Sequence, residues 1–126
     1  RRSSKEVQST VVHELTHFIY FEKWKAVFPD YDEKTFDRPH LIWALSEVLA
    51  HAINKDERIA KIVPCVGGGY WEWQSIIRFE NGMQVNIYDY FRKLYETHLK
   101  NKTSFADFLK LSYKEIEQFK EELGAK

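Results

Sequence analysis

Residues 3–22, which read SSKEVQSTVVHELTHFIYFE, decide the first element of this chain and the chemistry that it carries. Ser3 and Glu6 have the spacing of a capping box, in which each side chain accepts a hydrogen bond from the other residue's backbone N–H at a helix start. Apolar residues then recur at helical spacing and form one stripe, made of Val7, Val11, Leu15, Phe18 and Ile19. This pattern predicts a helix over residues 4–25, and Pro29 follows its end.

The segment His13-Glu14-Leu15-Thr16-His17 lies inside this helix and has the form H-E-x-x-H. Residues four positions apart project from the same side of a helix, so the imidazoles of His13 and His17 can bind one zinc ion. Glu14 lies next to them, where its carboxylate can take a proton from a water that zinc activates. Apolar residues flank the motif, as we expect for a buried active-site helix: Val11, Val12, Leu15 and Phe18.

A catalytic zinc takes three protein ligands and keeps one position open. A second helix is predicted over residues 38–53, because Asp37 can cap it, Pro39 is tolerated in its first turn, and apolar residues follow at helical spacing. This helix presents Glu47 and His51, again four positions apart. The residue types alone leave the third ligand open, and the other candidates are His40, Cys65 and His98.

The first motif, followed by a helix that contains Ser46-Glu47-Val48-Leu49-Ala50-His51, resembles the gluzincin metallopeptidases. In that family a glutamate on a downstream helix is the third zinc ligand. The resemblance covers roughly residues 5–52. It implies Zn²⁺ as the cofactor, His13, His17 and Glu47 as metal ligands, and Glu14 as the general base.

The resemblance has two departures. Thermolysin-like members of the family often carry an aspartate four residues after the ligand glutamate, and His51 stands at that position here. We expect His51 to be catalytic, either as a donor to the oxyanion or as a hydrogen-bonding partner of a ligand. Those enzymes also have a β-sheet before the active helix, whereas only about a dozen residues precede His13. Other candidate oxyanion donors are Tyr88, Tyr90 and His98.

Residues 70–88 have the pattern of a β-hairpin. Apolar and polar residues alternate from Trp71 to Phe79 and again from Met83 to Ile87, as in strands. We expect a three-residue loop, Glu80-Asn81-Gly82, since this register pairs Phe79 with Met83 and keeps the apolar residues on one face. Gly82 would then adopt the left-handed conformation.

The remaining patterns predict helices over residues 56–62, 89–100, 104–111 and 113–123. The fold class is therefore α+β, mostly helical with a small antiparallel β-hairpin, and the resemblance implies that it is zincin-like. The length of 126 residues predicts a single domain over residues 1–126. The resemblance implies that this domain is metallopeptidase-like, and we expect it to be a fragment that lacks upstream elements.

Composition narrows the partners. The 19 basic and 19 acidic residues balance, so the basic excess typical of a nucleic-acid binder is missing. No apolar run approaches the roughly 18 residues of a membrane span, and we expect no membrane partner. The lone Cys65 excludes an internal disulfide and fits a reducing compartment, which predicts a cytoplasmic protein.

These features predict a zinc-dependent hydrolase, a metallopeptidase that cleaves a peptide or protein substrate with Glu14 as general base. The alternative is a catalytically inactive, zincin-derived binding or regulatory module, because a fold does not guarantee an activity. Glu14 favours the enzyme, since a purely structural zinc site needs no base. The short stretch before His13 and the histidine at position 51 favour the alternative.

Overall fold

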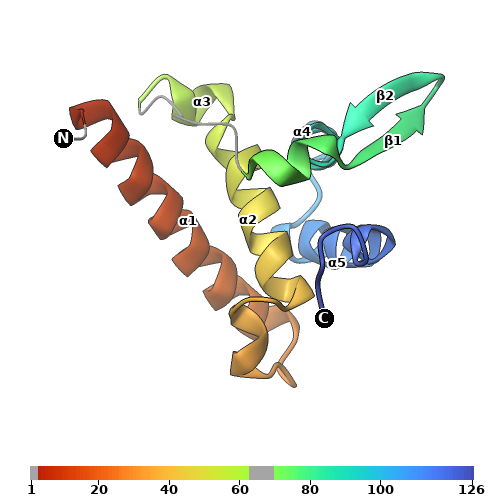
Figure 1. Ribbon diagram of the computed structural model, residues 1–126. Helices are drawn as coiled ribbons and strands as arrows, with labels where there is room; N and C mark the ends of the chain where they lie inside the picture. Colours follow the sequence, from red (N-terminus) through yellow and green to blue (C-terminus); the bar gives the residue numbers. More distant parts are fainter. Residues whose placement is uncertain (1–2, 63–69) are drawn as a thin grey trace.

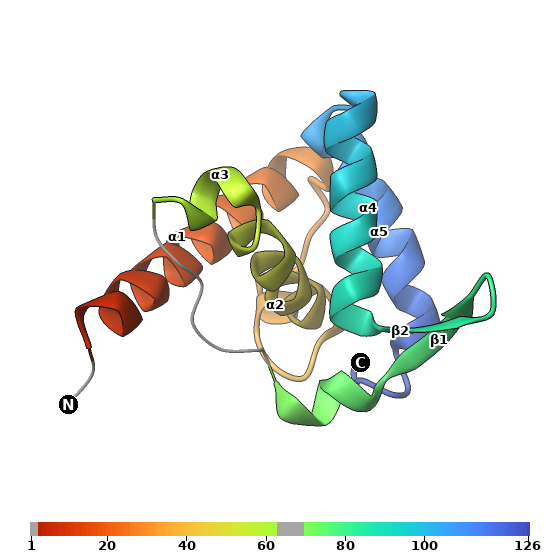
Figure 2. The same cartoon turned by 90° about the horizontal axis from the view of Figure 1, so that it is seen from above.

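The computed structural model describes residues 3–62 and 70–126, and most of these residues lie in helices (Figures 1 and 2). The α-helices are α1 (Ser4–Val27), α2 (Leu41–Asn54), α3 (Glu57–Ala60), α4 (Ile87–Asn101) and α5 (Phe105–Ile116). Three 3-10 turns, η1 (Glu33–Phe36), η2 (Trp71–Ser75) and η3 (Glu117–Phe119), and two strands, β1 (Ile77–Glu80) and β2 (Met83–Asn86), complete the described elements. The predicted α+β class, mostly helical with a small antiparallel hairpin, is confirmed.

Helix α2 is the centre of the fold. Most of its residues are buried, and Leu45 and Val48 are fully so. Helices α1, α4 and α5 all pack against it, α5 also contacts α1, and Figure 2 shows α4 and α5 side by side. A helix that is apolar on nearly all sides is stable only where other elements cover it. The side chains that α2 turns toward α1 therefore lie in a helix interface.

Helix α1 crosses α2 obliquely (Figure 1). Its start is as predicted, because the Glu6 backbone N–H donates to Ser3 Oγ at 3.2 Å and the Ser3 backbone N–H donates to Glu6 Oε2 at 2.6 Å. The helix ends at Val27, and Phe28 is its C-terminal cap. Pro29 follows, as the sequence predicted.

The predicted apolar stripe of α1 does not face the core. Its five members are 48% to 65% exposed: Val7, Val11, Leu15, Phe18 and Ile19. The side chains that α1 buries are His17, Tyr20 and Trp24, on the opposite side of the helix. Aromatic side chains remove more apolar area from water than Val or Leu, so this face packs on α2. The expectation of a motif flanked by buried apolar residues was wrong.

A matched pair of substitutions measures this difference. Leu45→Ala, at a fully buried position of α2, is expected to lower the free energy of unfolding by about 2–5 kcal/mol. Leu15→Ala removes the same atoms from a side chain that is 55% exposed, and its effect should stay within about 1 kcal/mol. Urea unfolding of both variants checks this, and equal losses would contradict the packing described here.

The β-hairpin is shorter than predicted and has another register. Residues 71–75 form η2 and not the start of a strand. Phe79 pairs with Gln84 and Glu80 with Met83, which leaves a two-residue Asn81-Gly82 turn. Both turn residues have positive φ, 51° and 78°, as a type I′ turn requires. Gly82 is left-handed as predicted, but the three-residue loop was wrong.

The reason for the hairpin register is the surroundings of the strands. Phe79 and Met83 are 69% and 71% exposed and point to opposite faces. Since little else covers the tip of the hairpin (Figure 1), burial does not select the register there, and the Asn-Gly turn does.

Two other boundaries differ from prediction. Helix α2 begins at Leu41, because residues just before it bind the C-terminal tail: the Lys126 N–H donates to Pro39 O and the Leu41 N–H donates to Lys126 O, each at 2.9 Å. Helix α5 continues through Ser112, which is fully buried inside it, so the predicted break at that position was wrong. Within residues 3–62 and 70–126, no helix has the length and apolar character that crossing a membrane requires.

Candidate metal centre

The crossing of α1 and α2 brings the three predicted metal ligands together. His13 and His17 lie one turn apart on α1, and Glu47 faces them from the middle of α2. Among the described residues, these three form the one group of His, Cys, Asp or Glu side chains with ligand atoms close enough to hold a metal ion, all within 4.8 Å of one another. The group therefore joins Glu47 to two histidines that precede it by 30 and 34 positions in the sequence.

The donor atoms form a small triangle. His13 Nε2 lies 2.9 Å from His17 Nε2 and 3.3 Å from Glu47 Oε2, and His17 Nε2 lies 3.1 Å from Glu47 Oε1. Each Nε2 carries at most one proton, so at most two of these three short contacts are hydrogen bonds at any time. A metal ion at the centre would instead be coordinated by both histidine nitrogens and the Glu47 carboxylate at the same time.

The triangle fits zinc. A tetrahedral ion with bonds of 2.0–2.1 Å places neighbouring ligand atoms about 3.3 Å apart, close to the separations found here. Two neutral imidazoles and one carboxylate leave a Zn²⁺ site with one net positive charge, as in known zinc peptidases. The side chains of His17 and Glu47 are 10% and 15% exposed, and that of His13 is 34% exposed. The centre therefore opens to solvent beside His13, where a fourth ligand has access.

The charges of the centre suit metal binding. Burial by itself raises the pKa of Glu47, but hydrogen bonds from His13 and His17 outweigh it and lower that pKa to about 2. The hydrogen bond to Glu47 raises the pKa of His13, burial opposes this, and the charges of Glu47 and Glu14 add to the rise. Glu47 is thus ionised at neutral pH, as a metal ligand must be.

Glu14 lies beside the metal group and is not part of it. Its side chain is exposed, and its charge reaches His13 strongly enough to contribute to the raised pKa of that imidazole. The charge of Glu14 therefore acts on the candidate ligand His13, while Glu14 itself lies outside the group that could hold a metal ion.

His51 lies one turn beyond Glu47 and stays outside the metal group. Its ring packs on Tyr88, with a centroid distance of 4.6 Å. Burial, helped by the positive charge of Lys55, lowers the pKa of His51 to about 4. The imidazole is therefore neutral at pH 7 and has one N–H to donate.

Tyr88, one of the candidate oxyanion donors, packs on the ring of His51, and the charge of Glu47 reaches its hydroxyl. Burial is the main reason why its pKa rises to about 12, and the negative charge of Glu47 adds to this. Its hydroxyl accepts a hydrogen bond from the Tyr70 backbone N–H at 2.8 Å. Among the described residues no acceptor takes the Tyr88 proton, so this proton can serve a ligand.

The other candidates lie elsewhere. His40 precedes α2 as its N-terminal cap, and His98 contacts Thr103 and stacks on Phe108. The hydroxyl of Tyr90 donates to Glu115 on α5. Cys65 lies outside the described residues. The structure therefore separates the side chains of His40, Tyr90 and His98 from the group of His13, His17 and Glu47.

Two contacts that position the ligands were not predicted. Thr16, inside the motif, places its Oγ1 3.1 Å from the side-chain oxygen of Asn54 at the end of α2. Tyr20 donates from its hydroxyl to the Ile42 carbonyl near the start of α2, at 2.9 Å. These contacts hold α1 on α2 on either side of His17. Periodicity cannot reveal them, because they depend on how the two helices cross.

Comparisons with protein-family models, with curated proteins and with solved structures found no match for this chain.

Proposed function

We propose that this protein is a zinc-dependent hydrolase, a metallopeptidase that cleaves peptide bonds. The observation that carries the proposal is the convergence of His13, His17 and Glu47 on one point, with Glu14 beside them. A purely structural zinc site closes around its metal with four protein ligands, whereas the described part of the chain offers three here, and the His13 side chain is 34% exposed.

The residues then have distinct tasks. His13, His17 and Glu47 would hold the zinc ion, which when bound lowers the pKa of water toward 7 and polarises a carbonyl group. Glu14 accepts the proton of the attacking water and later delivers it to the leaving amine. Proton transfer of this kind contributes about 10²–10⁴-fold to a rate.

We assign the role of oxyanion donor to Tyr88, because it packs on His51 and the charge of Glu47 reaches it. Since its hydroxyl accepts from the Tyr70 N–H, its orientation is held and its own proton points elsewhere. The raised pKa keeps the group protonated at neutral pH. The neutral imidazole of His51 packs on the Tyr88 ring and supports its position. His51 thus has either the role of a second donor or that of a positioning residue.

Replacing Tyr88 by phenylalanine tests this assignment. We expect kcat to fall about 10²–10³-fold, the usual cost of losing one oxyanion donor, with the zinc content unchanged. Tyr90→Phe is the matched control, because its hydroxyl binds Glu115 away from the centre and its loss should leave kcat unaltered. Equal kcat values for the two variants would remove Tyr88 from the mechanism.

The proposal as a whole is tested by loading the purified chain with zinc and measuring cleavage of a mixture of peptides by mass spectrometry. The expected result is one zinc per chain and new peptide termini that disappear with a chelator. Zinc binding without cleavage would support a second candidate, a zincin-derived binding module. The exposed apolar side chains along α1 favour that candidate, since such surfaces mark interaction sites.

A further inference from the structure

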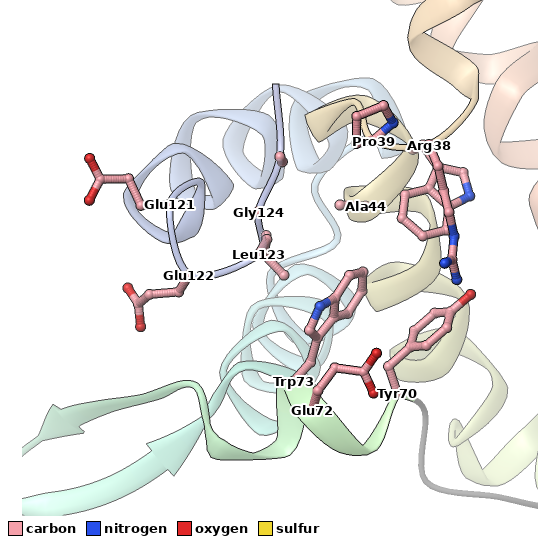
Figure 3. A pocket seen from close by; sticks show the side chains of 12 residues that line it. Arg38, Pro39, Ala44, Tyr70, Glu72, Trp73, Glu121, Glu122, Leu123 and Gly124 are labelled. Carbon is pink, nitrogen blue, oxygen red and sulfur yellow. The ribbon is translucent and has the colours of Figure 1, made fainter.

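A pocket of about 380 Å³ lies where the start of α2, the turn η2 and the C-terminal tail meet (Figure 3). Its walls are mainly aromatic and apolar, and one cation reaches into it. The residues that matter for its chemistry are Arg38, Trp43, Tyr70, Glu72, Trp73 and Leu123. None of these side chains has a part in the metal centre.

Arg38 is the unusual member of this pocket. Its guanidinium carbon lies 4.7 Å from the centre of the Trp43 ring and 5.0 Å from that of Tyr70. Figure 3 shows the Arg38 and Tyr70 side chains directed toward each other. Stacking engages the faces of a guanidinium and leaves its N–H edge open. Within residues 3–62 and 70–126, no carboxylate lies within ion-pair distance of Arg38.

The acidic residues around the pocket leave this edge available. The side chains of Glu121 and Glu122 point away from the pocket in Figure 3, and Glu122 is bound by Arg78 at 2.6 Å. Glu72 is exposed and lines the same pocket. The charge of Glu72 in this pocket opposes that of an anionic ligand and therefore disfavours a ligand with more than one negative charge.

The pocket adjoins the metal centre along α2. Trp43 precedes Glu47 by one helical turn, so both project from the same side of the helix. The Trp43 ring contacts that of Tyr70 at 6.1 Å, and the Tyr70 N–H binds the Tyr88 hydroxyl. A chain of contacts therefore leads from the stacked Arg38 to the donor that we assign to the oxyanion.

We propose that this pocket binds a carboxylate next to an apolar or aromatic group, with Arg38 as the anchor. A guanidinium edge matches a carboxylate through two parallel hydrogen bonds, and the rings of Trp43 and Trp73 fit an apolar side chain. The peptide C-terminus and an acidic side chain both supply such a carboxylate. In its role as a substrate site this inference rests on the proposed function, since a peptide held here extends toward the centre.

The experiment is an NMR titration of the metal-free protein, so that a carboxylate probe cannot bind the metal. The probes are N-acetylphenylalanine, its neutral amide, and N-acetylglutamic acid α-amide, whose one carboxylate is in the side chain. We expect the Arg38 Nε and Trp73 indole signals to shift with N-acetylphenylalanine, and the amide to bind at least about tenfold more weakly. Tighter binding of the glutamic acid probe would assign the carboxylate to an acidic side chain.

Variants separate the role of Arg38 from general effects of charge. Arg38→Gln should lower the affinity for N-acetylphenylalanine at least about tenfold and leave that for the amide unchanged. Arg38→Lys should restore only part of it, because an ammonium cannot make the paired contact. Arg92→Gln, at an exposed position of α4, is the control. Equal binding of acid and amide, or no effect of Arg38→Gln, would overturn the proposal.

The result is independent of the enzymatic proposal. Carboxylate binding that depends on Arg38, in a protein that fails to cleave peptides with zinc, would refute the hydrolase and leave the pocket standing. Cleavage without such binding would refute the pocket alone.

Discussion

Replacing Glu47 by alanine is expected to lower the affinity for zinc at least about a hundredfold. Structural zinc sites with four ligands bind with about 10–16 kcal/mol, or about 2.5–4 kcal/mol per ligand, and 1.4 kcal/mol corresponds to a factor of ten. The Glu47 carboxylate lies 3.1 and 3.3 Å from the two imidazoles, and it is the ligand that α2 contributes. The variant therefore keeps only the two histidine ligands of α1. Zinc remaining after dialysis against a competing chelator measures the effect.

His51→Ala is the informative control for Glu47→Ala, since both residues lie on α2 and both are chemically able to bind zinc. His51 is outside the metal group, so its loss should lower the zinc affinity by no more than about tenfold. Losing a residue that hydrogen-bonds to a ligand typically lowers the metal affinity by about 10–100-fold, and tenfold is the lower end of this range. The effect of His51→Ala should fall mainly on kcat. Loss of zinc from His51→Ala with retention by Glu47→Ala would exchange the two roles and end the resemblance to gluzincins.

Replacing Glu14 by glutamine is expected to keep the zinc and the fold and to lower kcat for peptide cleavage by about 10²–10⁴-fold. An amide has nearly the same shape as a carboxylate but cannot accept the proton of the attacking water. Because Glu14 is exposed and lies outside the metal group, neither the zinc content nor the circular dichroism spectrum should change. Peptide cleavage and metal content are measured on the same preparation.

Glu22→Gln supplies the control for Glu14→Gln. Glu22 is also on α1 and exposed, but its partner is Lys25 at 3.2 Å, so its substitution should leave kcat unchanged. An unreduced rate in Glu14→Gln would exclude it as the general base.

The two histidines of the candidate metal group were predictable because helical geometry is local. Four positions along a helix return to the same side, so His13 and His17 had to lie together once the helix formed. The capping box of Ser3 and Glu6 set its start in the same local way. For Glu47, helical spacing could only place it beside His51, and the resemblance to a family selected between them. The structure brings Glu47 and not His51 to the histidines.

The misjudged features depend on which surfaces meet. The stripe from Val7 to Ile19 is as regular as a buried face, yet the aromatic side of α1 packs on α2 and leaves the stripe in solvent. Likewise, the alternation in the hairpin predicted a register with Phe79 opposite Met83. That register would be favoured only if one face of the hairpin were buried, and both side chains are exposed. In both cases periodicity identifies an apolar face, but whether that face becomes buried depends on which other elements pack against it.

The sequence by itself determined helix α1, the pairing of His13 with His17 and the place of Glu14 beside them, because each follows from interactions within a few residues. Only the tertiary structure decided that Glu47 lies beside the two histidines, that His51 packs on Tyr88, and that Arg38 stacks on Trp43 and Tyr70. Most of these contacts join residues that are far apart in the sequence, and the sequence pattern does not show how close such residues lie in space. They are set by how α1, α2 and α4 cross, and the burial of apolar surface between helices selects that crossing.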